Sequence, residues 1–159
     1  MVNYPPNINT MESIVITLLG SLMILLNYWV DYQKQHFRNW ISGPNGMVER
    51  DYKIWCKPVK YIEINMVNND GETRKSWLLL SGFWGIARHM NYTFELLLAF
   101  VWTTPAINLS PLPFLYVIFL SVLLVHRVFR DEKKCFEKYS KEWIQYCKFV
   151  KWRMIPFVF

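Results

Sequence analysis

The sequence predicts an all-α integral membrane protein, and three features of its 159 residues indicate this class. Residues 13–30 contain no charged side chain, and residues 92–126 form a second long apolar block. Every Lys and Arg lies between or after these blocks, and three cysteines do not fit a disulfide-stabilised secreted fold. We expect about three transmembrane helices (13–30, 93–106 and 112–126), a re-entrant or interfacial segment, a small cytosolic hairpin insert and a C-terminal amphipathic helix.

Residues 13–30 are expected to form the first membrane span. A helix of this length extends about 27 Å, which approaches the thickness of the bilayer hydrocarbon core. Tyr28 and Trp29 at its C-terminal end are typical of the aromatic belt at a membrane interface. A buried helix of a soluble protein is the alternative. A signal peptide is disfavoured, because residues 1–12 contain no Lys or Arg.

Residues 92–126 are expected to form two antiparallel helices, over about 93–106 and 112–126. Pro105, Pro111 and Pro113 separate them, because prolines at this density end helices. Glu95 near the start of the first helix is either a functional group at membrane depth or an interfacial side chain. Residues 77–87 are apolar but too short to span, so they predict a re-entrant or interfacial piece, or the wall of a cavity.

Two further segments are expected on the cytosolic side. Residues 61–76 alternate at their start and then turn at Asn-Asp-Gly, which predicts a β-hairpin. Residues 130–149 predict an amphipathic helix or two short ones. At about 100° per residue, one sector of about 80° holds four residues: Asp131, Cys135, Tyr139 and Tyr146. A second stripe holds Phe136, Trp143 and Phe149. This helix either lies in the interface with its aromatic stripe toward lipid, or forms a polar and aromatic wall for a nucleotide.

The distribution of charge predicts the topology. Residues 1–33 contain no Lys or Arg, whereas eight fall in 34–75 and nine in 127–153. Since positively charged loops stay in the cytosol, we expect a lumenal N-terminus, a cytosolic segment over 31–92, a lumenal proline-rich turn and a cytosolic C-terminus. The net charge of +6 is then explained by contact with the lipid membrane, and no nucleic-acid partner is expected.

The sequence lacks the motifs of several common kinds of catalytic or binding site. There is no glycine-rich phosphate loop, no GxSxG and no HExxH. Cys135 and Cys147 have no matching pair of histidines, so no metal site is expected.

A polar constellation remains beside the predicted spans. Lys34 and Arg38 are one helical turn apart and either clamp a phosphate or snorkel as membrane anchors. Arg88 and His89 precede an apolar helix and could bind an anion at its N-terminus, unless His89 is structural. Asp131 could accept a hydrogen bond from an amide or a ribose hydroxyl, or serve as a helix charge. The residues alone therefore predict a membrane enzyme that binds a phosphorylated cofactor.

One run of residues carries a resemblance to a known family: LLLSGFWGIARHMNY, from Leu78 to Tyr92. It is similar to a motif of the sterol reductases, which reduce sterol double bonds with NADPH. The C-terminal part agrees through three segments, at 124–127, 130–135 and 153–156. Among its members the resemblance is closest to those that reduce the C7–C8 bond of 7-dehydrocholesterol, through Ser-Gly-Phe-Trp-Gly, Ile54-Trp55-Cys56-Lys57-Pro58 and Asp70-Gly71.

The resemblance implies NADPH as the cofactor, a sterol as the substrate and the endoplasmic reticulum membrane of a eukaryotic cell as the location. It implies that Lys34 and Arg38 engage a cofactor phosphate, and that Leu79 and Trp84 line the pocket. The other implied contacts are Asn91, Tyr92, Asp131, Cys135, Phe136, Glu137, Lys138, Tyr139 and Tyr146.

The resemblance covers about Tyr4 to Phe159 but only the C-terminal portion of the much longer family proteins. The sterol pocket and the proton donor are then expected partly in N-terminal spans. Whether this chain is active alone, and whether a second polypeptide supplies those spans, therefore stay open. The family usually follows Asn-Tyr with x-Gly-Asp, whereas this chain has Thr93-Phe94-Glu95. Phe94 is therefore expected to fill space in the pocket or at a helix contact.

Two other functions stay open. Membrane methyltransferases of the isoprenylcysteine and phospholipid type have a similar C-terminal arrangement and bind S-adenosylmethionine, but this chain has Met90-Asn91 where they have a proline. The second is a truncated, non-catalytic remnant.

Overall fold

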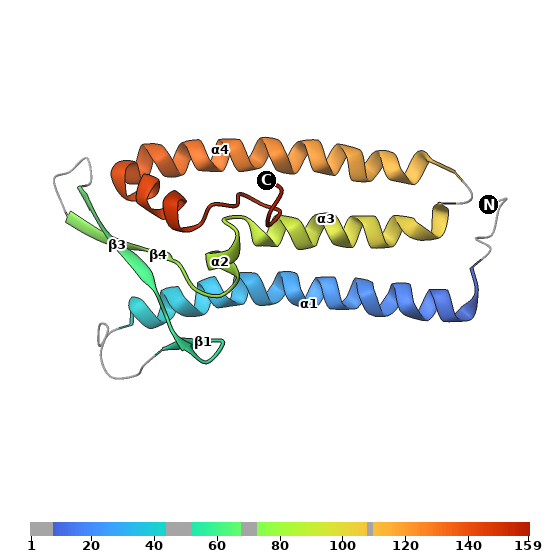
Figure 1. Cartoon of the computed structure of the whole chain (residues 1–159), viewed down its shortest axis with the longest axis horizontal. Helices are drawn as coiled ribbons and strands as arrows, with labels where there is room; N and C mark the ends of the chain where they lie inside the picture. Colours follow the sequence, from blue (N-terminus) through green and yellow to red (C-terminus); the bar gives the residue numbers. More distant parts are fainter. Residues whose placement is uncertain (1–7, 44–51, 68–72, 108–109) are drawn as a thin grey trace.

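The computed structural model describes residues 8–43, 52–67, 73–107 and 110–159. Three long helices lie side by side, with α3 between α1 and α4 (Figure 1). The strands and the short helix α2 gather at one end of this bundle, and the chain between α3 and α4 lies at the other (Figure 1).

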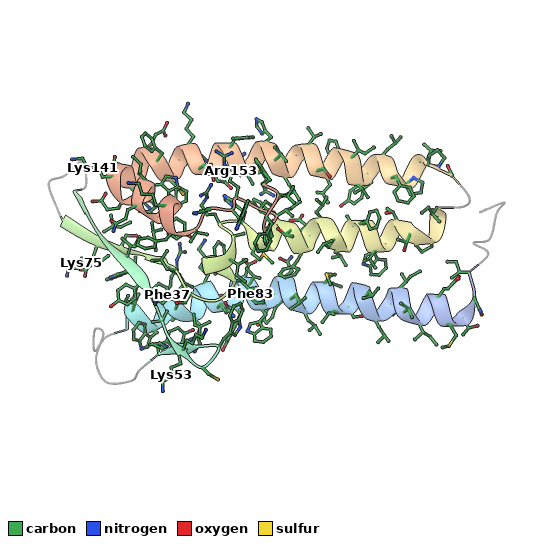
Figure 2. The ribbon with its side chains drawn as sticks, viewed as in Figure 1. Phe37, Lys53, Lys75, Phe83, Lys141 and Arg153 are labelled. Carbon is green, nitrogen blue, oxygen red and sulfur yellow. The ribbon has the colours of Figure 1, made fainter. Side chains whose placement is uncertain are left out.

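Helix α1 (Thr10–Ile41) contains the predicted first span and continues beyond it. Its start is stabilised by Glu12, whose carboxylate accepts a hydrogen bond from the backbone N–H of Asn9 at 3.1 Å. Large apolar side chains such as Leu18 and Leu25 are exposed along α1, as Ile118 and Phe119 are along α4 (Figure 2). Outward-facing apolar side chains are typical of helices in contact with lipid.

Helices α1 and α4 (Leu112–Phe149) are long and apolar enough to cross a membrane. Helix α3 (Met90–Thr103) and the 3₁₀ turn η1 (Thr104–Ala106) coincide with the predicted span 93–106. Since α3 has only 14 residues, against roughly 20 for a full span, the count of three spans stays a prediction. The two helices of the predicted pair do contact each other, and η1 begins beside Pro105, where the proline-rich segment predicts a break.

The structure corrects the prediction of a separate C-terminal helix over 130–149. Helix α4 runs on from 112 without a boundary at 126–130, because no proline or glycine interrupts that stretch. The break instead lies at Ser140, whose φ of 45° and ψ of −110° reverse the direction of the chain (Figure 1). Residues 150–159 then fold back beside α3, and Thr93 donates a hydrogen bond to the carbonyl of Met154 at 2.6 Å.

Two small sheets accompany the helices, and the sequence predicts one of them. Strands β3 (Tyr61–Val67) and β4 (Thr73–Leu79) pair antiparallel, as expected for a hairpin at 61–76, and the Asn-Asp-Gly turn lies outside the described residues. Strands β1 (Lys53–Ile54) and β2 (Lys57–Pro58) form a second short pair that the sequence analysis did not expect. The segment 77–87 is divided between β4 and the short helix α2 (Phe83–Ile86), with Trp84 buried.

The described residues contain three apolar clusters, of which two join helices to strands and one joins α3, α4 and the C-terminal segment. One joins α1, β1 and α2 and contains Val30 and Phe37, both essentially inaccessible. Phe94, the departure from the family pattern, also belongs to it, with its ring centroid 5.7 Å from that of Phe83. It therefore fills a helix contact. Burial of side chains of this size contributes roughly 1.5–3 kcal/mol each, which fixes the end of the bundle where the strands lie.

Candidate functional site

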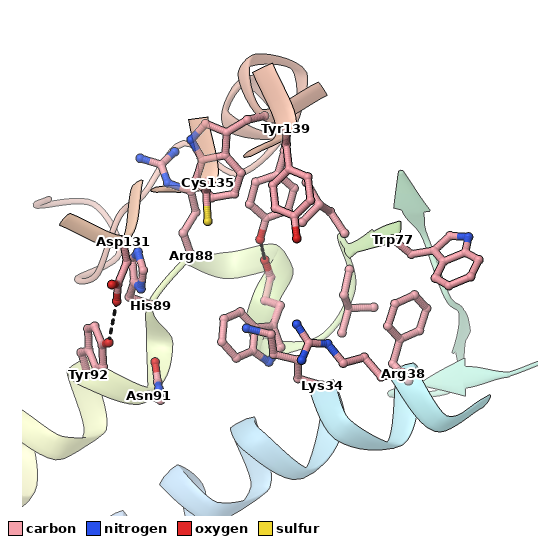
Figure 3. Close-up of a pocket in the computed structure, with 16 residues that line it drawn as sticks. Lys34, Arg38, Trp77, Arg88, His89, Asn91, Tyr92, Asp131, Cys135 and Tyr139 are labelled. Atoms are coloured by element: carbon pink, nitrogen blue, oxygen red, sulfur yellow. Dashed lines mark hydrogen bonds between the residues drawn. The ribbon is translucent and has the colours of Figure 1, made fainter. Parts of the chain in front are cut away.

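A cavity of about 230 Å³ lies at the end of the bundle, between α1, β4, the start of α3 and the second half of α4 (Figure 3). Its lining draws on segments far apart in the chain: Lys34, Phe37, Arg38, Trp77, Leu78, Leu79, Trp84, Arg88, His89, Asn91, Tyr92, Asp131, Cys135, Tyr139, Trp143 and Tyr146. Ten of these are among the thirteen residues that the family resemblance implies for cofactor binding.

Two cations from α1 face this cavity. Lys34 and Arg38 are one turn apart, as the sequence predicts, and both extend from α1 into it (Figure 3). The Lys34 ammonium lies 3.9 Å from the centroid of the Trp84 ring, and the indole N–H of Trp84 donates to the carbonyl of Val30 at 2.9 Å. Among the described residues, neither cation lies within ion-pair distance of a carboxylate. Burial, and then the neighbouring Arg38, lower the pKa of Lys34, which lies beyond the apolar stretch 13–30.

The start of α3 supplies a polar group on the other side. The Tyr92 hydroxyl donates a hydrogen bond to Asp131 Oδ2 at 3.0 Å, which joins α3 to α4 (Figure 3). His89 stacks on the Tyr92 ring at 5.2 Å, and burial lowers its pKa to about 4, so it is neutral near pH 7. His89 Nε2 and Asn91 Oδ1 are buried and have no hydrogen-bond partner within the described part of the chain.

Glu132 ties this region to the C-terminal segment. Its carboxylate accepts from Arg88 Nε at 2.8 Å and Nη2 at 2.7 Å, and from Arg153 Nε at 3.0 Å. Arg88 also donates from Nη1 to the carbonyl of Val150 at 2.7 Å, and the backbone N–H of His89 donates to the carbonyl of Arg153 at 2.8 Å. Arg88 is therefore an internally paired side chain that fixes its neighbours, and not the anion-binding group that the sequence suggests.

The wall formed by α4 is built from both sides of its kink. Asp131, Cys135 and Tyr139 come from before Ser140, on the common face that the spacing predicts. Tyr146 also reaches the cavity, although the kink breaks the helical phase, and its hydroxyl donates to the carbonyl of Trp84 at 3.1 Å. Burial raises the pKa of the Cys135 thiol, which keeps it protonated.

Three residues expected to contact the cofactor do not line this cavity: Phe136, Glu137 and Lys138. Lys138 lines a neighbouring cavity instead. Trp143 belongs to the stripe that the sequence analysis places either toward lipid or in a wall for a nucleotide, and the lipid alternative is wrong for it: it is only 8% exposed, lines the cavity and stacks on Tyr146. The kink turns it inward, whereas Phe136 and Phe149 remain exposed.

Sequence reasoning did not single out Phe37, Trp77 or Leu78 as site residues. Phe37 and Trp77 are aromatic residues among many, and only the pairing of β4 with β3 brings Trp77 to the cavity. Their one detectable signal is position: Phe37 lies between Lys34 and Arg38 on α1, and Trp77 precedes Leu79 on β4.

Comparison with known proteins gives a consistent set of relatives. A family model described as "Ergosterol biosynthesis ERG4/ERG24 family" matches residues 1–159. A 7-dehydrocholesterol reductase of Arabidopsis thaliana is 41% identical over 159 residues, which are all of this chain and 35% of the relative. A Delta(14)-sterol reductase of Methylotuvimicrobium alcaliphilum is 42% identical over 127 residues, 80% of this chain and 26% of the relative. The erg24 Delta(14)-sterol reductase of Schizosaccharomyces pombe is 38% identical over 156 residues, 98% of this chain and 32% of the relative. The chain thus spans about a third of the length of these curated relatives or less.

Proposed function

The chain belongs to the ergosterol biosynthesis ERG4/ERG24 family, and on this basis we propose that it carries the cofactor-binding portion of an NADPH-dependent sterol reductase. The observation that carries the proposal is the pair Lys34 and Arg38, which face the cavity and lie outside ion-pair distance of every carboxylate in the described part of the chain. Two cations without an ion-pair partner beside an aromatic wall suit a ligand with both phosphate groups and planar rings.

The donor set of the cavity fits NADPH. Lys34 and Arg38 would hold a phosphate, and the rings of Trp84 and Tyr139 offer surfaces for a planar group. Asn91, with its unpartnered amide oxygen, would accept a hydrogen bond from an amide or hydroxyl of the cofactor. When bound, NADPH would supply the hydride for the double bond.

The chain's own part in this reaction is to bind and orient NADPH and to exclude water from the cavity. The Tyr92 hydroxyl directs its proton at the Asp131 carboxylate, and this hydrogen bond joins α3 to α4 at the cavity. The buried hydrogen bond from Tyr146 to the Trp84 carbonyl joins the end of α4 to α2 at the same cavity. The family membership, together with the apolar helices α1 and α4, supports access of a sterol from the membrane.

A binding experiment tests the cofactor. The dissociation constants of NADPH and S-adenosylmethionine are measured for the detergent-purified chain, for Lys34→Ala/Arg38→Ala and for the control Lys53→Ala/Lys57→Ala. The control removes the same charge from the exposed β1–β2 pair. We expect the first double variant to lose at least about tenfold in NADPH affinity, since contacts to charged groups contribute roughly 1.5–3 kcal/mol each. Binding of S-adenosylmethionine in preference to NADPH would support the methyltransferase alternative and overturn the proposal.

For the substrate we propose the C7–C8 double bond of 7-dehydrocholesterol. The support is the 41% identity to a 7-dehydrocholesterol reductase over the whole chain. Relatives named for the Δ14 bond have similar identities, so the test includes both substrates. Expression of the chain in a sterol-producing cell should lower the Δ5,7-diene and raise the Δ5 product. Loss of the Δ14 sterol instead would reassign the bond, and a profile without change would contradict turnover by this chain alone.

We further propose that the chain is a multi-pass protein of the endoplasmic reticulum membrane, with the cavity and the C-terminus in the cytosol. The support is the concentration of Lys and Arg in 34–75 and 127–153, where Lys34 and Arg38 line the cavity. A membrane-impermeant thiol reagent should label the exposed Cys56 in intact microsomes. Labelling only after the membrane is opened would reverse the topology.

A further inference from the structure

A second cavity of about 350 Å³ adjoins the first at the end of α1. The two share four lining residues, Phe37, Arg38, Trp77 and Tyr139, so they lie side by side, and we refer to them together as the groove. Five consecutive residues of β4, from 75 to 79, line the two cavities in turn. The β3–β4 hairpin is therefore one wall of the whole groove.

The charges of the second cavity have one sign. Arg38 of α1, Lys75 of β4 and Lys138 of α4 line it, and no Asp or Glu is among its lining residues. Lys75 lies 2.7 Å from Glu63 on the neighbouring strand, with side chains that are 60% and 36% exposed. An ion pair with this exposure is weak, so an incoming anion of higher charge can take Lys75 from Glu63.

The size of the first cavity also calls for an extension. Its 230 Å³ lies below the range of roughly 300–1,000 Å³ of small-molecule sites, and a dinucleotide is a large and elongated ligand. The second cavity adds the missing length, and the buried indole N–H of Trp77, which has no hydrogen-bond partner among the described residues, lies at the junction.

We infer that the second cavity holds the ribose 2′-phosphate of the dinucleotide, and that Lys75 on the β3–β4 hairpin makes the chain prefer NADPH to NADH. This inference rests on the proposed function. A 2′-phosphate carries close to two negative charges near pH 7, and the three cations that line the second cavity can balance that charge. Because NADH lacks this phosphate, Lys75 contributes to the binding of NADPH and not of NADH. Glu63 competes with the phosphate for Lys75.

The test measures dissociation constants of NADPH and NADH for the full chain and three variants. Lys75→Met removes the cation and keeps the apolar stem. Glu63→Gln removes its competitor, and Lys53→Met removes another exposed charge, from β1 and apart from the groove (Figure 2). We expect Lys75→Met to weaken NADPH about tenfold and NADH less than about twofold. Glu63→Gln should strengthen NADPH about two- to threefold, and Lys53→Met should change neither.

If Lys75→Met weakens NADPH binding and Glu63→Gln strengthens it, the effects reflect recognition of the 2′-phosphate, because damage to the fold of the hairpin would weaken binding in both variants. Equal weakening of NADPH and NADH by Lys75→Met, or unchanged NADPH affinity, would overturn the inference while leaving the proposed function intact. Absence of NADPH binding by the unaltered chain would overturn the proposed function and the inference with it.

Discussion

Replacement of Glu132 by Gln should destabilise the region that surrounds the cavity. Glu132 is 14% exposed and Arg88 only 6%, and the carboxylate accepts from both Arg88 and Arg153. Removal of one partner from a buried ion pair costs about 3–5 kcal/mol, because the other charge stays buried without compensation. Gln can still accept one hydrogen bond, and Arg88 keeps its hydrogen bond to the carbonyl of Val150. We therefore expect the free energy of unfolding to fall by about 3 kcal/mol, the lower end of this range.

This loss can be measured by thermal unfolding in detergent. A chain of this size shifts its midpoint by roughly 2–4 °C per kcal/mol, which gives a fall of about 6–12 °C. Glu137→Gln is the matched control, because Glu137 is an exposed acid on the same helix, outside the cavity. Equal midpoints for the two variants would refute the claim that the Arg88–Glu132–Arg153 group holds α3, α4 and the C-terminal segment together.

Three further perturbations have defined outcomes. The pKa of His89 is lowered to about 4, so between pH 6.5 and 4 the unfolded chain binds a proton at this residue and the folded chain does not. The free energy of unfolding should therefore decrease by about 3 kcal/mol as the pH falls through that window. His89→Gln should remove this dependence in a pH series of unfolding midpoints. Gly82→Ala should lower the unfolding midpoint by several degrees, because Gly82 has φ of +67° and an added Cβ would meet the Gln33 carboxamide. Tyr146→Phe should cost about 1 kcal/mol in the same assay by removing the hydrogen bond to the Trp84 carbonyl; an unchanged midpoint would contradict its role in joining the end of α4 to α2.

Much of the site could be predicted from local spacing. Lys34 and Arg38, and likewise Asp131, Cys135 and Tyr139, are separated by single helical turns, so helix geometry alone places each set on one face. Asn91 and Tyr92 are the last two residues of the run that resembles a motif of the sterol reductases, and the structure brings both to the cavity.

Contacts between distant segments could not be predicted in the same way. The partner of Arg88 is Glu132, 44 positions later, and nothing local distinguishes Glu132 from a charge on a solvated helix. The sequence left open whether Trp143 faces lipid or a cavity, because the positive φ of Ser140 that turns it inward has no glycine to signal it. Burial at the end of α4 therefore depends on a backbone reversal that hydrophobic periodicity does not encode.

The most direct measurement of the central claim is protection of Cys135 from a thiol reagent. Cys135 is half-buried and lines the cavity, whereas Cys56 is exposed on the β1–β2 pair and serves as an internal control. Labelling rates at each cysteine are followed by mass spectrometry with and without NADPH. We predict that NADPH at saturating concentration slows labelling of Cys135 and leaves Cys56 unchanged, and that Lys34→Ala/Arg38→Ala abolishes the protection. Unaltered labelling of Cys135 in the presence of bound NADPH would contradict the assignment of this cavity to the cofactor.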